Sequence, residues 1–185
     1  MKEVKLYMVL LGCRPKGRLT EQHDVFFGIA TSLKKLIPHM IKAWPEAKKN
    51  MHIDAWREVT YQDGYAIKVI AKNKAIESKQ KLFFINLGGY KKEEFEEYHY
   101  KMLAAGKNAA AAIKNAKQAN FYKHAGFRGA ESHVDDKYGI DVDDVYILKD
   151  ILAPVFKEKY TIELEKKELC ADKIHLGYLM LKKIK

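Results

Sequence analysis

The sequence lacks the features that mark an exported, disulfide-stabilised or membrane-spanning protein. Of its 185 residues only two are cysteines, Cys13 and Cys170, which stand far apart and in no paired motif. Neither a disulfide framework nor a zinc knuckle is predicted, and a reducing compartment is expected. No apolar run approaches the roughly 18 residues that a membrane-spanning helix needs. No recognised catalytic, cofactor or metal-ligand motif is present, so no cofactor is predicted.

The N-terminus resembles a lipoprotein leader, because a charged start and a short apolar run precede Leu-Leu-Gly-Cys. Two observations favour a buried strand instead. The pattern returns in mid-chain as KLFFINLGG, where it cannot act as an export signal. The run at residues 6–11 is also shorter than the roughly 7–15 residues of a signal core. We therefore expect a cytoplasmic protein with no membrane association.

The net charge is +10 and is unevenly distributed along the chain. Residues 1–80 hold 15 Lys and Arg against 8 Asp and Glu, a balance of +7. Such a surface attracts an anionic ligand or nucleic acid as a partner. A lysine-rich solvated surface explains the charge equally simply, and we favour it because the lysines are scattered. Whether the chain forms a homo-oligomer stays open.

Two blocks of the sequence recur. At a shift of 76 positions KLYMVLLG (residues 5–12) meets KLFFINLG (residues 81–88), and Glu21 and His23 meet Glu97 and His99. At a shift of 81, the HID of residues 52–54 meets the HVD of residues 133–135, and the DGYAI of 63–67 meets the DVYIL of 144–148. The chain therefore reads as two copies of one unit followed by a tail.

Each copy is expected to be strand, strand, helix, strand, strand. Continuous apolar runs and β-branched residues indicate the strands. An apolar stripe at helical spacing after Ser32 indicates the helix, which Pro38 should either kink or restart. Asn108 takes the place of Ser32 in the second copy, and both are good helix N-caps. Asp63-Gly64 signals a tight hairpin. In the first copy these elements are residues 6–11, 23–31, 33–44, 51–60 and 65–71.

These observations predict an α+β fold, with two tandem β-β-α-β-β repeats that form a mixed sheet with helices on one side. The first repeat covers residues 1–76 and the second covers 77–152, in which residues 142–148 take the place of the fourth strand. A C-terminal strand pair at residues 153–185 packs on the repeats. The simplest picture of that tail is an antiparallel pair made of residues 160–165 and 174–181.

The first copy resembles an uncharacterised bacterial family, domain of unknown function 1543. The resemblance rests on KLYMVLLG, then HDVFF, MHIDAW and DGYAIKV, and covers about residues 5–70. The second copy matches in part, since HIDAW has become HVDDK. The family occurs with one or two copies per chain, which implies the tandem arrangement. It implies no activity and no catalytic residues.

The best candidates for chemistry are His23 with Asp24 and His52 with Asp54. Residues two apart on a strand share a face, so His52 and Asp54 point the same way, and His23 opens the neighbouring strand region. If the strands adjoin, the imidazoles and carboxylates form either a metal site or an acid–base pair. The structural alternative, which we favour, is that each histidine bonds a carbonyl or its Asp and fixes a loop.

Two further sets are candidates for ligand binding. The second copy offers His99, His133 and Asp135, but Tyr100 follows His99 where Asp24 follows His23. The loop after the first strand holds three basic residues between glycines and would suit an anion, although it lacks the Lys-Ser or Lys-Thr of a phosphate-binding loop. Its basic residues are Arg14, Lys16 and Arg18.

The sequence favours a non-catalytic binding or structural module whose partner is unknown. One alternative is a hydrolase-like or metal-assisted enzyme that uses the His/Asp cluster. Another is a nucleic-acid-binding protein that uses the basic first repeat.

Overall fold

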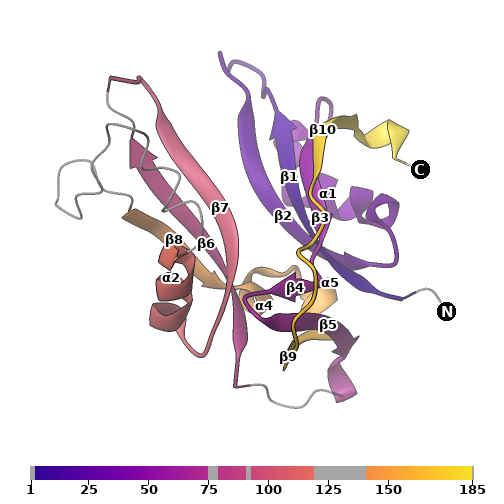
Figure 1. Cartoon of the computed structure of the whole chain (residues 1–185). Coiled ribbons are helices and arrows are strands. Elements are labelled where there is room, and N and C mark those ends of the chain that lie inside the picture. The colour runs from indigo at the N-terminus through magenta and orange to yellow at the C-terminus, as the bar shows by residue number, and fades with distance from the viewer. Residues whose placement is uncertain (1–2, 75–78, 91–92, 119–140, 185) are drawn as a thin grey trace. The chain divides into compact units, whose positions relative to one another are not determined.

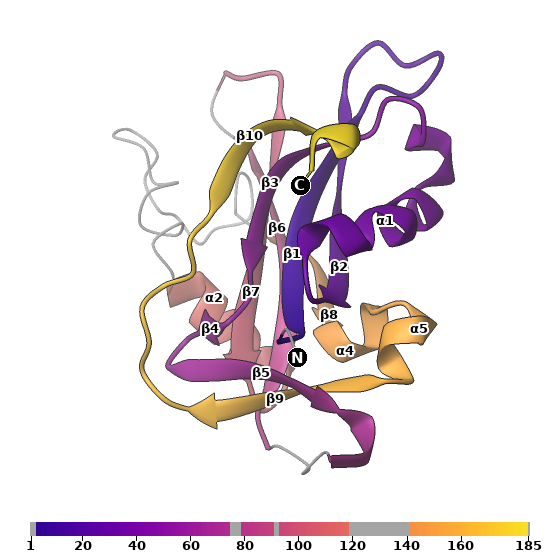
Figure 2. The same ribbon diagram turned by 90° about the vertical axis from the view of Figure 1, so that its right-hand side faces the viewer.

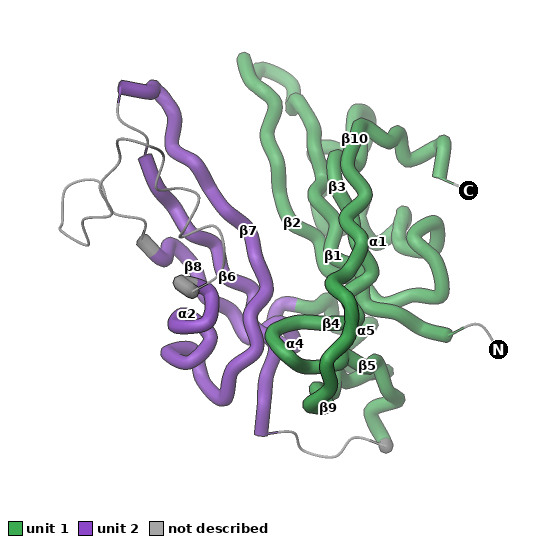
Figure 3. Tube along the Cα trace, viewed as in Figure 1, with its two compact units in different colours: residues 1–76, 152–185 green, residues 77–151 purple. Residues whose placement is uncertain are grey.

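The structure is a computed structural model that describes residues 3–74, 79–90, 93–118 and 141–184. The chain divides into two compact units (Figure 3). Unit 1 contains Met1–Ile76 and Leu152–Lys185, and unit 2 contains Glu77–Ile151. The fold is α+β, with antiparallel sheets and few helices. In the described part of the chain, no helix is long and apolar enough to cross a membrane.

The main sheet of unit 1 is built around β1 (Lys5–Cys13), whose side chains are mostly buried. β1 pairs with β2 (Gln22–Ala30) on one side and β3 (His52–Glu58) on the other, and β10 (His175–Met180) adds to the far edge of β3 (Figure 1). All three pairings are antiparallel. The continuous apolar run of the sequence therefore forms a central strand, as expected of a strand covered on both faces.

A second, three-stranded sheet of unit 1 has the order β4-β5-β9 (Figure 2). β4 (Tyr61–Gln62) and β5 (Tyr65–Ala71) are joined by Asp63 and Gly64, at φ values of 50° and 81°. Positive φ at both central residues defines the type I′ hairpin turn that Asp-Gly favours, so the predicted tight turn is confirmed. β9 (Tyr160–Lys166) pairs with β5 along its whole length.

The first helix follows β2 and restarts at a proline, as predicted. The 3₁₀ helix η1 (Leu33–Leu36) leads into α1 (Ile37–Ala43), which carries its proline in the first turn. A Cβ on Gly28 would lie 2.7 Å from Cδ2 of Leu36, so this glycine lets the helix approach the sheet closely. Three short helices complete the unit: η2 (Pro45–Ala47), η3 (Lys72–Lys74) and η4 (Leu181–Lys183).

α5 (Pro154–Lys157) also belongs to unit 1 and places Phe156 in the interior, 4% exposed. Unit 2 is a three-stranded antiparallel sheet of order β7-β6-β8 with α2 packed against it. Its core includes Ile85 and Leu87 of the central strand and Ala112 and Ala116 of the helix. Its elements are β6 (Lys81–Tyr90), β7 (Glu97–Gly106), α2 (Ala109–Gln118), β8 (Asp141–Ile147) and α4 (Leu148–Ile151).

The predicted N-cap of α2 is confirmed, because Oδ1 of Asn108 accepts a hydrogen bond of 2.9 Å from the backbone N–H of Ala111. Ser32 occupies the corresponding position before η1 but makes no such bond. An N-cap side chain satisfies a backbone donor that the helix leaves unpaired, and only the second of the two caps does this.

Three parts of the predicted fold are wrong. Every pairing between the described strands is antiparallel, so the strands do not form a mixed sheet. β9 and β10 pair with β5 and β3, not with each other as a C-terminal strand pair. Residues 142–148 were expected in the fourth-strand position, but β8 pairs with β6 as β3 pairs with β1. The physical reason is common to all three: alternation of side chains predicts a strand and its faces, whereas its neighbour depends on long-range packing.

Candidate functional site

A row of three residues crosses the main sheet of unit 1 at the end of β1. Gly12 stands directly opposite His23 of β2 and directly opposite His52 of β3. Directly opposed residues of antiparallel strands project to the same face, so both imidazoles flank the place where Gly12 has no side chain. A Cβ there would lie 2.4 Å from Nε2 of His52 and 2.2 Å from Oδ2 of Asp54. The glycine therefore makes room for the two side chains to meet.

Asp54 reaches this row through a β-bulge. The pairing of β1 with β3 runs from Leu11 opposite Ile53 to Leu10 opposite Ala55, and skips Asp54. A bulge places an extra residue on one strand and re-aims its side chain. Here it brings the Asp54 carboxylate above Gly12, between the two histidines.

The four side chains of Glu21, His23, His52 and Asp54 converge on this point, and we call them the histidine–carboxylate cluster. Nε2 of His23 lies 3.3 Å from Oδ2 of Asp54 and 4.0 Å from Oε2 of Glu21. Nε2 of His52 lies 2.9 Å from Oε1 of Glu21 and 3.3 Å from Oδ1 of Asp54. In both imidazoles Nε2 is thus the ring nitrogen that lies within 4.0 Å of both carboxylates.

His52 is the buried member of the cluster, with 3% of its surface exposed. Its Nδ1 lies 3.2 Å from the carbonyl oxygen of Asn50, and its ring packs on that of Tyr178 at a centroid distance of 4.2 Å. A carbonyl oxygen only accepts, so Nδ1 carries the proton of this hydrogen bond. In the neutral ring Nε2 then presents a lone pair.

That lone pair has no hydrogen-bond partner among the described residues, although Glu21 is only 2.9 Å away. The contact lies outside hydrogen-bond geometry, and an unprotonated nitrogen has no proton to donate to a carboxylate. Oδ2 of Asp54 is a second buried polar atom of the cluster without a hydrogen-bond partner in the described chain. A buried polar atom without a hydrogen bond costs free energy, and the contacts within the cluster leave this cost at two of its atoms.

The Glu21 carboxylate also acts on the neighbouring thiol of Cys13. Cys13 ends β1 in the interior, with its Sγ 3.8 Å from the carbonyl oxygen of Ala47. Burial raises the pKa of this thiol, and the negative charge of Glu21 raises it further. Cys13 is therefore held as a neutral thiol, which makes it a poor nucleophile and a poor metal ligand.

Of the four residues predicted to carry chemistry, the structure brings together His23, His52 and Asp54. Asp24 is adjacent in sequence but follows the alternation of β2 to the other face, where its Oδ1 accepts a 2.7 Å hydrogen bond from the N–H of Val25. Glu21 was missed as a candidate. Its signal was present in the sequence, since Glu-x-His occurs at residues 21–23 and again at 97–99.

Unit 2 contains part of the same arrangement. Gly88 stands opposite His99 of β7, and β8 skips Asp143 at a bulge, as β3 skips Asp54. Nδ1 of His99 lies 3.0 Å from Oδ2 of Asp143, and its Nε2 lies 3.8 Å from Oε2 of Glu97. Two differences separate the units. Asp141 stands opposite Gly88 where His52 stands opposite Gly12, and Nδ2 of Asn86 lies 3.3 Å from Oδ2 of Asp143 as a hydrogen-bond donor.

The remaining ligand-binding candidates are not part of the cluster. His133 and Asp135 lie outside the described residues. The three basic residues of the loop after β1, namely Arg14, Lys16 and Arg18, are exposed at the tip of the β1–β2 hairpin. There Gly17, at a φ of 82°, supports a turn closed by a 3.2 Å hydrogen bond from the N–H of Arg18 to the carbonyl of Pro15. That this loop binds an anion or nucleic acid stays a prediction.

Comparison with known proteins adds fold and family information but no activity. Residues 18–69 match the family described as Domain of Unknown Function (DUF1543). This span contains all four residues of the histidine–carboxylate cluster and supports the resemblance of the first copy, but it does not extend to a second copy. No curated protein matches the chain.

Among solved structures, the chain is similar to the crystal structure of a protein Il1583 from Idiomarina loihiensis. The TM-score is 0.60 and the sequence identity 21%, over 98% of this chain and 99% of that one. At this identity the likeness concerns the fold alone.

Proposed function

We propose that unit 1 is a binding module for a divalent transition-metal ion, held by the histidine–carboxylate cluster. One observation carries the proposal. The buried Nε2 of His52 lies 2.9 Å from Oε1 of Glu21 and 3.3 Å from Oδ1 of Asp54 and forms no hydrogen bond in the described chain. With Nδ1 donating to the Asn50 carbonyl, Nε2 of the neutral ring carries the lone pair. The lone pair and the negative carboxylate oxygens repel one another, whereas a cation placed among them attracts all of these atoms.

The residue types suit such an ion. Neutral imidazole and carboxylate are the ligands of zinc and of non-haem iron or manganese sites. The contact of His52 Nδ1 with the Asn50 carbonyl is the outer hydrogen bond that orients a metal-ligating histidine. With neutral imidazoles the two carboxylates give the cluster a charge of about −2, which one divalent ion neutralises.

The spacing between donor atoms also suits one ion. Metal–ligand distances of about 2.0–2.2 Å place neighbouring ligands about 3.0–3.5 Å apart in octahedral or tetrahedral geometry. The nitrogen–oxygen separations of 2.9 and 3.3 Å at His52, and of 3.3 Å between His23 and Asp54, are of this size.

Binding requires some side chains to move. As the described side chains lie, no group of three or more His, Cys, Asp or Glu is placed to hold a metal ion. The two that have to turn inward are Glu21 and His23, whose side chains are 45% and 39% exposed and therefore have the freedom to rotate. His52 and the bulged Asp54 are the less exposed pair around which they close.

We further propose that unit 2 is a second copy of the same unit that has lost the site. The shared strand order, the glycine in the central strand and the bulged aspartate support the relationship. With Asp141 in the position of His52, and an amide N–H of Asn86 directed at Asp143, the described part of this copy offers one imidazole and a competing donor at this point. Unit 2 is therefore an internal control for unit 1.

The test is a titration of the full chain with Zn²⁺, and with Co²⁺ as a spectroscopic probe, by calorimetry and visible absorption. We expect one ion per chain, and a loss of affinity of more than about 100-fold in His52→Ala and Glu21→Gln. The matched control, His99→Ala, should bind like the wild type. An equal loss in the His99 variant, two equivalent ions per chain, or no binding to the wild type would each reject the proposal.

A further inference from the structure

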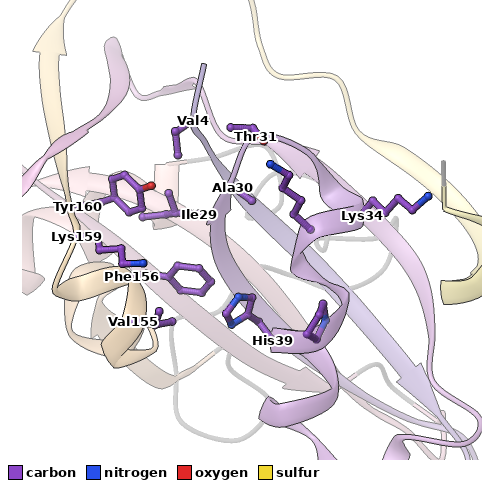
Figure 4. A pocket seen from close by; sticks show the side chains of 12 residues that line it. Val4, Ile29, Ala30, Thr31, Lys34, His39, Val155, Phe156, Lys159 and Tyr160 are labelled. Atoms are coloured by element: carbon purple, nitrogen blue, oxygen red, sulfur yellow. The ribbon is translucent and has the colours of Figure 1, made fainter. Parts of the chain in front are cut away.

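Unit 1 also has an open cavity of about 500 Å³, which shares no lining residue with the histidine–carboxylate cluster. One wall comes from the end of β2 and from η1 and α1, and the other comes from α5 and the start of β9 (Figure 4). The wall residues thus belong to both stretches of chain that make up unit 1. The volume lies within the roughly 300–1,000 Å³ of small-molecule sites.

The floor of this cavity is apolar and aromatic. Phe156 is 4% exposed and packs against the ring of His39, with ring centroids 4.8 Å apart (Figure 4). Ile29 and Val155 extend the apolar surface on either side. A flat or branched hydrocarbon group that packs against these side chains would be removed from water, which favours binding.

The rim has charge of one sign. Lys34, Lys35 and Lys159 line the cavity, and none of its twelve lining residues is an Asp or Glu. Tyr160 and Thr31 add hydroxyl groups at the opening. An ammonium group on a flexible stem is a strong donor to carboxylate, sulfonate or phosphate oxygens, so the rim selects an anionic head.

We propose that this cavity binds a small organic anion whose apolar body lies on Phe156 and whose anionic group is held by Lys34, Lys35 and Lys159. Neither half of the site would suffice alone. Exposed lysines bind free anions weakly because water and salt screen them, and a neutral apolar molecule leaves the lysines without a partner. The proposal is independent of metal binding at the cluster, because the two sites share no residue.

The experiment uses 1-anilinonaphthalene-8-sulfonate as the probe, which is fluorescent, aromatic and anionic, and titrates it into the folded full chain. We expect saturable binding of one probe per chain that weakens as salt rises. The neutral analogue N-phenyl-1-naphthylamine should bind more weakly, because it cannot engage the lysines.

Two charge-matched double variants decide whether the cavity is responsible. Lys34→Gln with Lys35→Gln should lower probe affinity by about five- to tenfold. Lys48→Gln with Lys49→Gln removes the same charge from another exposed pair of unit 1 that does not line the cavity, and should change it less than about twofold. Phe156→Leu should also weaken the probe while the chain stays folded by circular dichroism. Equal losses in the two lysine pairs, or no saturable binding, would overturn the proposal.

Discussion

Gly12→Ala tests the geometry of the histidine–carboxylate cluster most directly. The added Cβ would lie 2.4 Å from Nε2 of His52 and 2.2 Å from Oδ2 of Asp54. Both separations are far inside van der Waals contact, so at least two side chains have to move. Asp54 can swing outward, because 25% of its side chain is exposed. His52 has no such freedom, since it is buried and the ring of Tyr178 packs against it.

The expected loss follows from two opposing effects. Replacing a strand glycine by alanine normally favours folding by about 0.4–1 kcal/mol, because the unfolded chain loses freedom. Forcing a methyl group into a filled interior costs about 1–3 kcal/mol. Because the clash falls on the buried ring of His52, we expect the second effect to dominate, with a net loss of about 1–2 kcal/mol in the free energy of unfolding.

The assay is urea unfolding followed by tryptophan fluorescence, which reports on unit 1 because both tryptophans, Trp44 and Trp56, lie there. Gly88→Ala is the matched control. The nearest atoms to its Cβ would be those of the Asp143 carboxylate, at 2.5 Å, and that side chain is 29% exposed and can turn away. The control should leave the tryptophan transition unchanged. If Gly12→Ala is as stable as the wild type or more so, His52 does not lie over the glycine and the described site is incorrect.

Three further predictions concern stability. Asn108→Ala should lower the free energy of unfolding of unit 2 by about 1 kcal/mol, measured by circular dichroism in urea. Ser32→Ala should cost little, because only Asn108 makes the cap hydrogen bond. Equal losses in the two variants would contradict the cap assignment. Burial, and secondarily Glu58, raises the pKa of Tyr7 to about 12, above the value near 10 of an unfolded tyrosine. The stability that comes from the raised pKa of Tyr7 is therefore complete below about pH 10 and is lost as pH rises through 12. Tyr7→Phe should flatten the decline in melting temperature between those two pH values. Asp172 accepts bonds of 3.1 Å from the backbone N–H and 2.6 Å from the hydroxyl of Thr60, so Asp172→Ala should cost about 2–3 kcal/mol in chemical unfolding, and a loss under about 0.5 kcal/mol would show that these bonds are not formed in solution.

The candidate site shows which of its residues can be predicted from the local sequence pattern. Spacing two residues apart placed His52 and Asp54 on one face of a strand, and the structure agrees. The same rule could not exclude Asp24, because the sequence does not say which face of β2 is shared with His52 of β3, two strands away in the sheet. Glu21 was overlooked because it precedes β2 in the chain, and only the folding of the hairpin returns it to within 2.9 Å of His52.

Some features of the fold could likewise be predicted from the sequence and others could not. The sequence by itself determined the positions of most strands, the Asp63-Gly64 hairpin, the break in the first helix at Pro38 and the cap at Asn108. Each of these depends on side chains within a few residues and on the φ/ψ preferences of the backbone. Only the tertiary structure decided that β9 and β10 join different sheets, that β8 takes the place of β3, and that a bulge lifts Asp54 over Gly12. These choices rest on hydrogen-bond register between residues far apart in the chain, where a shift by one residue exchanges the two faces of a strand.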